Sequence, residues 1–376
     1  MLSVSYFCAG LLLLPHLTQV LSLLSTKLIP LLAFILWAAI SLLWTTSPMH
    51  GIQNIVVIST LLIMIWVAEG TILADVSFAL WLERIVGFSV LLASGIYGGT
   101  LILSAPGNSD VIGARSFGVF ALLGVAHFLS KWRYGSKTGL AGAIAITFLI
   151  GASQSRLALG IAVFLFPLAQ LPAAKFGRFI KMILVLVIAG LASYGALVYF
   201  DSLRNRFSTG DMSLKVGSWA INVSGRLSFW RVTMQSIEEA PIVGKGAGST
   251  EGLIESVFVD IQHAHSDYLR ILHDYGCVGM ALWLIAALTL LTSLWRSWRL
   301  ADRISRDTAR IHLAALLSLI AFLLEMVADN AIVYPFIIAP LGLIIGSAFD
   351  VRKSKSKTKL MPRTRVAVPV LNASGA

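Results

Sequence analysis

The sequence is poor in charged residues. Only 12% of the 376 residues are Asp, Glu, Lys or Arg, and 57% are hydrophobic. A soluble domain carries about 25% charged residues. Apolar runs of about 17–25 residues recur along the whole chain instead, and each is long enough to cross about 30 Å of hydrocarbon. We therefore expect an all-α polytopic membrane protein that forms a single membrane domain over residues 1–376, which leaves no room for a soluble catalytic module.

Other absences limit the kinds of metal, cofactor and nucleotide site that the chain can be expected to carry. The two cysteines, Cys8 and Cys277, both fall in apolar runs, so we expect both to be buried, without a disulfide or a metal. The sequence shows no cluster of carboxylates or His/Cys ligands, and we predict no metal and no other cofactor. The glycine-rich segment 244–249 fits neither the P-loop nor the dinucleotide pattern. We therefore expect no ATP-binding site and no ATP among the partners.

The apolar runs predict about eleven transmembrane helices. The first run lacks a basic start and a small-residue cleavage site, so we interpret it as a span and not as a signal peptide. The predicted spans are residues 4–24, 28–44, 52–73, 78–103, 112–130, 138–153, 156–171, 178–200, 276–295, 311–328 and 331–350.

Basic residues collect in short connections on one side of these spans. By the positive-inside rule this side is the cytoplasm, which predicts the orientation of a multi-pass inner-membrane protein. The net charge of +11 is then an orientation signal, and no nucleic-acid partner is expected. The C-terminal residues 351–376 form a basic cytoplasmic tail, which we expect to be disordered. The basic connections contain Lys131, Arg133, Lys137, Lys175, Arg178, Lys181, Arg296, Arg299, Arg303, Arg306 and Arg310.

One long polar segment, residues 201–265, interrupts the pattern and faces the periplasm if this orientation holds. An amphipathic helix is predicted over 226–239, ended by Pro241 and followed by a glycine turn. A second helix begins at Ser266 or Asp267, which are both good N-cap residues, and runs to Gly276. The first helix places four apolar side chains at helical spacing: Leu227, Trp230, Met234 and Ile237.

Several polar side chains are predicted to gather at the outer surface. Arg115 and Arg156 each open a span, while His263 and His265 lie where the long loop re-enters the membrane. Asp329 and Asn330 join the last two spans, with Glu325 one turn deeper. A charge at mid-membrane costs roughly 2.5–3.5 kcal/mol on insertion scales, so charges gathered at one rim indicate a site. The alternative is that each arginine only reaches towards lipid headgroups.

Three segments resemble the O-antigen ligase and O-antigen polymerase superfamily. They are SQSR (153–156), GRLSFWRVTMQSIEEAPIVGKGAG (225–248) and HAHSDYLRILHDYGCVGMALWL (263–284), and they occur in the order typical of that family. Two features depart from the family pattern. The residue after the motif histidine is Ser266 where the family often has Asn, and the Asn-containing motif that often follows the arginine equivalent to Arg115 is absent. The family is usually described with twelve spans, so eleven implies a missing first span or a different start.

The resemblance implies a glycan transferase that acts at the periplasmic face. Its donor is an oligo- or polysaccharide linked to undecaprenyl diphosphate, and its acceptor is a sugar hydroxyl of lipid A–core or of a growing glycan. The implied reaction inverts the anomeric centre without metal or ATP. His265 is the implied base. The arginines that bind diphosphate are Arg156, Arg226 and, with a weaker match, Arg115. Candidate substrate contacts are His263, Trp230, Tyr268 and Asp329.

Two other functions remain open from the sequence. A polysaccharide transporter or flippase would need ionisable residues and broken helices near the bilayer midplane. A non-catalytic membrane protein of envelope assembly would leave the Arg and His residues at the outer rim without a role.

Overall fold

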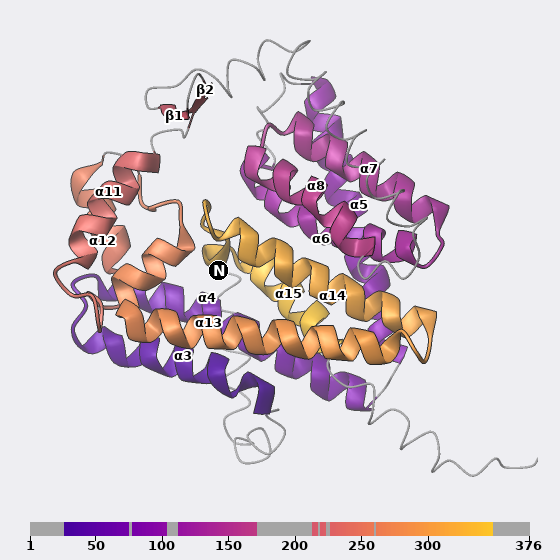
Figure 1. The fold of residues 1–376 in the computed structure, drawn as a ribbon, viewed down its shortest axis with the longest axis horizontal. Helices are drawn as coiled ribbons and strands as arrows, with labels where there is room; N and C mark the ends of the chain where they lie inside the picture. Colours follow the sequence, from indigo (N-terminus) through magenta and orange to yellow (C-terminus); the bar gives the residue numbers. More distant parts are fainter. Residues whose placement is uncertain are drawn as a thin grey trace, which may run out of the picture.

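The computed structural model is a bundle of long helices with a small cap at one end (Figure 1). The structure describes residues 26–74, 77–103, 112–170, 213–216, 219–222, 226–258 and 261–348. The predicted spans 4–24 and 178–200, the tail and Cys8 lie outside these residues. The described helices of the bundle are α3 (Ile29–Ile40), α4 (Pro48–Ala74), α5 (Ser77–Leu103), α6 (Ala114–Arg133), α7 (Lys137–Ala152), α8 (Arg156–Gln170), α13 (Asp267–Ala301), α14 (Arg306–Glu325) and α15 (Pro335–Gly346).

Five of these helical segments are long and apolar enough to cross a membrane. They are Thr26–Leu43, Pro48–Ile72, Ser77–Leu103, Asp267–Ala301 and Arg306–Glu325, the first of which joins α3 to short 3₁₀ turns on either side. The helices α7, α8 and α15 are apolar but shorter. A multi-pass membrane protein is therefore confirmed, whereas the count of eleven spans stays a prediction.

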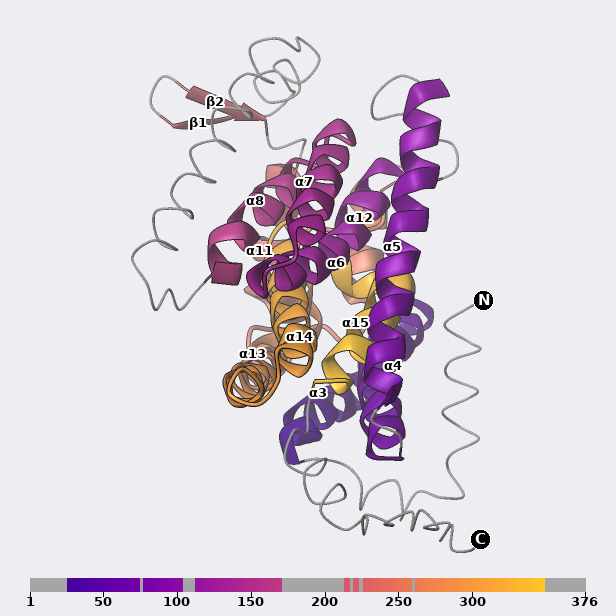
Figure 2. The ribbon, with the colours of Figure 1, turned by 90° about the vertical axis from the view of Figure 1, so that its right-hand side faces the viewer.

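Helix α6 lies at the centre of the bundle. Every residue from Phe117 to Ser130 except Phe120 is buried. Glycine permits the close approach of neighbouring helices, because a Cβ atom on Gly124 would meet Val90 of α5. In Figure 2, α6 and α14 lie between α13 on one side and α5 on the other.

The predicted periplasmic segment forms a cap beside the start of α13 (Figure 1). The cap consists of α11 (Arg226–Ile237) and α12 (Ser249–Val257). The same segment contains an antiparallel pair of strands, β1 (Ser213–Val216) and β2 (Trp219–Asn222), with Ser213 opposite Asn222, which lies apart from these helices in Figure 1. Helix α11 confirms the predicted amphipathic helix, but the prediction of which side chains it buries was partly wrong. Phe229 and Thr233 are buried there, whereas Met234 is 57% exposed.

Helix α13 confirms the predicted helix start and the break at Gly276. The Ser266 hydroxyl accepts a hydrogen bond from the Leu269 N–H at 3.4 Å and caps the helix. Gly276 has a φ of 65°, which interrupts the helix between its cap-side turns and its span. The expectation that Cys277 is buried was wrong. This side chain follows the break and is exposed, facing away from the bundle interior.

Hydrogen bonds define two opposite ends of the bundle. At one end, Asp267 N–H donates to the Met326 carbonyl at 2.9 Å, which joins the start of α13 to the end of α14. At the other, the Tyr134 hydroxyl donates to Asp302 at 2.7 Å, between the α6–α7 and α13–α14 turns. The described basic connections, from Lys131 to Lys137 and from Arg296 to Arg310, belong to this second end. The cap and the candidate site belong to the first.

Candidate functional site

A cleft of about 790 Å³ opens at the cap end of the bundle. Its walls come from the start of α6, from α12 and the segment that follows it, and from the connection between α14 and α15. Segments far apart in sequence therefore meet in one space. The lining residues are Arg115, Glu255, Phe258, Ile261, Gln262, His263, His265, Asn330 and Tyr334.

His265 lies in this cleft with one ring nitrogen turned towards the bundle. Its Nδ1 atom lies 2.9 Å from Nδ2 of Asn330 and 3.2 Å from a terminal nitrogen of Arg115. Its ring lies 5.9 Å from the ring of Phe229, centroid to centroid. The side chain is only 18% exposed. His265 is therefore fixed in orientation by groups from α6, α11 and the α14–α15 connection.

The backbone at His265 is strained. Among the described residues, only Gln154 and His265 are non-glycine residues with positive φ, at 59° and 54°. Side chains with a Cβ atom rarely adopt this region, and such residues concentrate at functional sites. Gln154 belongs to the SQSR segment directly before α8, and His265 directly precedes the N-cap of α13. The two strained positions thus fall in two of the three motifs that the sequence singled out.

Asp329 holds Arg115 beside His265. Its Oδ2 atom lies 3.5 Å from Nε of Arg115, and its Oδ1 atom accepts the Asn330 N–H at 2.8 Å. Burial alone would raise the pKa of Asp329, but the positive charge of Arg115, the hydrogen bond from the Asn330 N–H and the charge of Arg226 outweigh it and hold the pKa below its ordinary value. Asp329 is thus an ionised carboxylate behind the cleft, where it positions Arg115.

Arg226 begins α11 and adds a second guanidinium to this end of the bundle. Burial lowers its pKa, and the positive charge of Arg115 acts in the same direction, while Asp329 and Glu325 oppose the shift. These interactions place Arg226 within electrostatic range of Arg115 and both carboxylates. Glu325, the last residue of α14, is fully buried, and among the described residues neither of its oxygens has a hydrogen-bond partner. Arg226 is therefore a partly buried guanidinium near Arg115, although it is not among the residues that line the cleft.

Arg156 begins α8 at the same end of the bundle as Arg115. Helices α6 and α8 run parallel, because Ser155 packs on Gly118 near their starts and Arg133 donates to the Ala169 carbonyl at 2.8 Å near their ends. Arg156 is half-buried and does not line the cleft. Arg156 therefore lies at the end of the bundle that holds the cleft, but it is not part of the contact between Arg115 and His265.

His263 lines the cleft two residues before His265. Burial lowers its pKa to about 4, and the nearby charges of Arg270 and His265 act in the same direction. The imidazole is therefore neutral near pH 7. Its Nδ1 atom lies 3.8 Å from Oε1 of Glu251, beyond hydrogen-bond distance.

The two aromatic candidates serve the packing around the cleft. The Tyr268 hydroxyl donates to the Leu323 carbonyl at 3.0 Å, which joins α13 to α14. Trp230 packs on the small apolar cluster of Phe229, Ile254 and Ala264 within the cap. Neither is among the residues that line the cleft. A direct contact of either ring with substrate stays a prediction.

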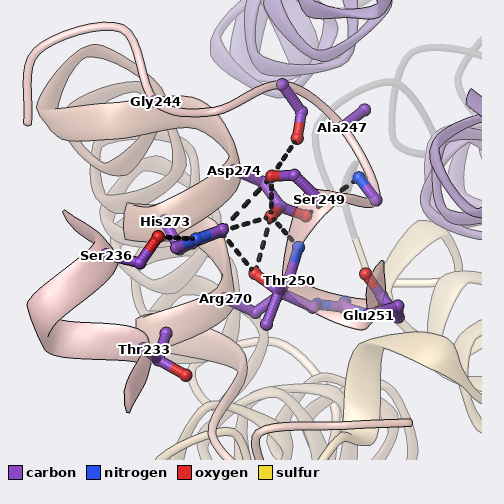
Figure 3. Close-up of polar contacts among 12 residues, drawn as sticks. Thr233, Ser236, Gly244, Ala247, Ser249, Thr250, Glu251, Arg270, His273 and Asp274 are labelled. Carbon is purple, nitrogen blue, oxygen red and sulfur yellow. Dashed lines mark hydrogen bonds and ion pairs between the residues drawn. The ribbon is translucent and has the colours of Figure 1, made fainter. Parts of the chain in front are cut away.

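A buried polar network supports the cleft from behind (Figure 3). Asp274 accepts hydrogen bonds from the backbone N–H groups of Gly248 and Thr250, at 3.0 and 2.8 Å, and from the hydroxyls of Ser249 and Thr250, at 3.0 and 2.6 Å. His273 lies between this group and the Ser236 hydroxyl of α11, 3.0 Å from Nε2. The network fixes the start of α12, which forms one wall of the cleft.

Arg270 also has a structural partner. Its guanidinium is buried and pairs with Glu251 at 3.1 Å and with Asp267 at 3.2 Å. Glu251 also accepts from the Asn54 amide at 2.9 Å. These contacts join α4, α12 and α13 below the cleft. The ion pairs of Arg270 therefore hold the cap in place.

The sequence interpretation did not assign a role to Asn330, and it did not predict α12. The adjacent polar pair Asp329–Asn330 between two apolar runs was the available signal for Asn330. Its contact with His265 spans 65 positions of sequence and depends on the fold. Helix α12 is only nine residues long and follows a glycine turn, which leaves little periodicity to detect.

Comparison with known families bears on residues 140–284. This segment matches the family model described as O-antigen ligase. Over this segment the chain is therefore similar to the O-antigen ligase family. No curated protein matches it. The matched segment contains Arg156, Arg226 and His265, whereas Arg115, Asp329 and Asn330 lie outside it. The fold therefore completes the candidate site with residues from both sides of the matched segment.

Proposed function

We propose that this chain transfers a glycan from a lipid-diphosphate carrier to a sugar hydroxyl. The observation that carries the proposal is the meeting of His265 and Arg115 at 3.2 Å in one open cleft. Arg226 lies within electrostatic range of Arg115. A group that can accept a proton and groups that can bind phosphate oxygens thus occupy one space. The match of residues 140–284 to the family model described as O-antigen ligase supports a transferase of this type at the level of the family.

The proposed roles follow from the chemistry of these side chains. His265 takes the proton of the acceptor hydroxyl, because imidazole titrates near neutral pH. The hydroxyl oxygen attacks the anomeric carbon, and the bond from that carbon to the phosphate oxygen breaks. Arg115 and Arg226 stabilise the charge that develops on the diphosphate, and Arg156 acts at the rim. Displacement from the opposite face inverts the anomeric centre.

The proposed setting is the periplasmic face of the bacterial inner membrane, with the C-terminus in the cytoplasm. The donor, an oligo- or polysaccharide on undecaprenyl diphosphate, enters from the bilayer. The acceptor is lipid A–core, for a ligase, or a growing glycan, for a polymerase. The phosphoester bond of the donor already holds the energy for transfer, so we propose that neither ATP nor a metal takes part.

A transporter or flippase is less well supported. Ionisable groups do occur among the spans, since Glu83 lies 2.7 Å from Arg310 and 3.8 Å from His127. However, Arg310 lies near the start of α14, at the end opposite the cleft. These contacts fasten α5, α6 and α14 together and are typical of a structural ion pair. The arginines to which we assign diphosphate binding lie at the other end.

The test uses purified protein in proteoliposomes with undecaprenyl-diphosphate-linked glycan, without ATP and with a chelator. We expect glycan transfer to one of two acceptors supplied in parallel, lipid A–core or a glycan primer, and the acceptor that reacts identifies a ligase or a polymerase. Transfer that requires ATP or added metal would contradict the proposed mechanism. Donor movement across the bilayer without transfer would favour the flippase.

A further inference from the structure

The nitrogen of His265 that faces the protein has neighbours of three different kinds. Arg115, 3.2 Å away, can only donate hydrogen bonds. The carboxylate of Asp329, with Oδ1 3.8 Å away, can only accept. The amide of Asn330, 2.9 Å away, can do either, because half a turn exchanges its nitrogen for its oxygen. Arg115 is therefore the neighbour that determines whether Nδ1 carries a hydrogen or presents a lone pair.

With Arg115 in this place, Nδ1 must present its lone pair. A neutral imidazole carries one proton, so that proton resides on Nε2. The Asn330 amide then presents its nitrogen to Nδ1, as the structure shows. In this arrangement Nε2 already carries a hydrogen and has no lone pair to accept the proton of an acceptor hydroxyl. The resting site thus holds His265 in the tautomer that cannot act as the base.

The contacts of Arg115 are weak enough for a substrate to replace them. Its side chain is 44% exposed, lines the cleft and pairs with Asp329 at 3.5 Å. A diphosphate offers several charged oxygens that match a guanidinium in two-pronged geometry. His265, by contrast, is held in its strained backbone conformation and beside the ring of Phe229. Arg115 is the member of the pair that is free to move.

We propose, building on the function proposed above, that the donor diphosphate draws Arg115 away from Nδ1 and thereby turns His265 into a base. The Asn330 amide rotates, and its oxygen accepts a hydrogen bond from Nδ1–H. His265 loses the Nε2 proton to water and gains one at Nδ1 from water, so its charge is unchanged. Nε2 can then take the acceptor's proton while the new glycosidic bond forms and the diphosphate leaves. Asn330 is a positioning residue in this scheme, and donor binding precedes activation.

The protonation state of His265 can be observed directly. The chain has seven histidines, so ¹⁵N labelling of histidine gives a spectrum in which His265→Gln identifies the signal of His265. Without ligand we expect the proton on Nε2, and with saturating inorganic diphosphate we expect it on Nδ1. Arg115→Met should show the Nδ1–H form in both conditions. Arg231→Met, on the exposed face of α11, should behave as the wild type.

Asn330 gives a second, kinetic test. Asn330→Asp keeps an acceptor for Nδ1–H and adds negative charge beside the ring, which favours the protonated imidazole. The acidic limb of the plot of kcat against pH should therefore move to higher pH by about 1–3 pH units. The other charged or titratable groups that face His265 are Arg115, Asp329 and His263, and they are unchanged in this variant. Asn330→Leu has no acceptor, and kcat should fall between about tenfold and about 10⁴-fold, the cost of a wrong tautomer in a Ser-His-Asp triad.

The results separate this inference from the function on which it rests. An Nε2–H to Nδ1–H change on adding diphosphate would support the inference even in a protein that transfers no glycan. The same wild-type tautomer with and without diphosphate, or the same tautomer in Arg115→Met and wild type when both are free of diphosphate, would overturn it even if transfer occurs. An unchanged pH profile in an active Asn330→Asp protein would also overturn it.

Discussion

Single side chains set the chemistry of the cleft, and Arg226 illustrates how position changes what an arginine does. Arg226 and Arg231 lie five residues apart on α11, but Arg226 is half-buried beside Arg115, Asp329 and Glu325, whereas Arg231 is exposed. Desolvation strengthens the attraction of a guanidinium for phosphate. The two arginines therefore form a matched pair for testing whether location at the cleft matters.

Arg226→Ala should lower the rate of glycan transfer by about 10²–10³, the usual effect of removing one preorganised contact to developing charge. Arg226→Lys should restore only part of the rate, because an ammonium group cannot reproduce two-pronged binding. Arg231→Ala is the control and should transfer at the wild-type rate. The measurement is the initial rate in proteoliposomes with insertion checked for each variant. Equal rates for Arg226→Ala and Arg231→Ala would remove Arg226 from the site.

Much of the candidate site could be predicted at this scale, and the limits are physical. Arg226 and His265 could be found because each lies in a motif of local sequence. The polar pair Asp329–Asn330 was visible, but its contact with His265 depends on how α13 and α14 pack. The ion pairs of Arg270 could not be predicted either, because Glu251 lies on the unpredicted helix α12. Residue type and location indicated the site, while only the fold assigned the partners.

At the scale of elements, the glycine turn between α11 and α12 is the joint that holds the cap to the bundle. Gly246 and Gly248 have φ values of 95° and 79°, and a Cβ atom on Gly248 would lie 2.2 Å from the Gly51 nitrogen at the start of α4. Asp274 of α13 secures the same turn from the other side. The sequence predicted a turn here, but its close packing depends on residues about 200 positions away, such as Thr45, whose hydroxyl donates to Ala247.

Asp274→Ala should destabilise the protein because it removes the acceptor from two buried backbone N–H groups and two hydroxyls. Each buried donor left without a partner costs about 1–3 kcal/mol. We expect a clear fall in the apparent Tm in detergent, measured by intrinsic fluorescence or light scattering. Asp307→Ala is the control, because its carboxylate is 74% exposed in a surface ion pair with Arg310 and contributes little. A wild-type Tm for Asp274→Ala would show that the network does not hold the cap.

At the scale of the whole molecule, the candidate site and the basic connections lie at opposite ends of the bundle. The cleft, the cap and the motif residues lie at one end, and the basic connections that contain Arg133 and Arg310 lie at the other. The asymmetry of Lys and Arg in the sequence predicted this division, because it follows from the alternation of apolar runs. The cleft itself could not be predicted, since it forms where the start of α6, α12 and the α14–α15 connection converge.

The central claim is that His265 activates the acceptor in a glycan transfer at this cleft. The most direct measurement is the initial rate of transfer in proteoliposomes for wild type, His265→Ala and His263→Ala, together with donor binding by each. We predict that His265→Ala lowers the rate by about 10²–10⁴ with donor binding nearly intact, and that His263→Ala is far milder. Near-normal transfer by correctly inserted His265→Ala protein would contradict the account.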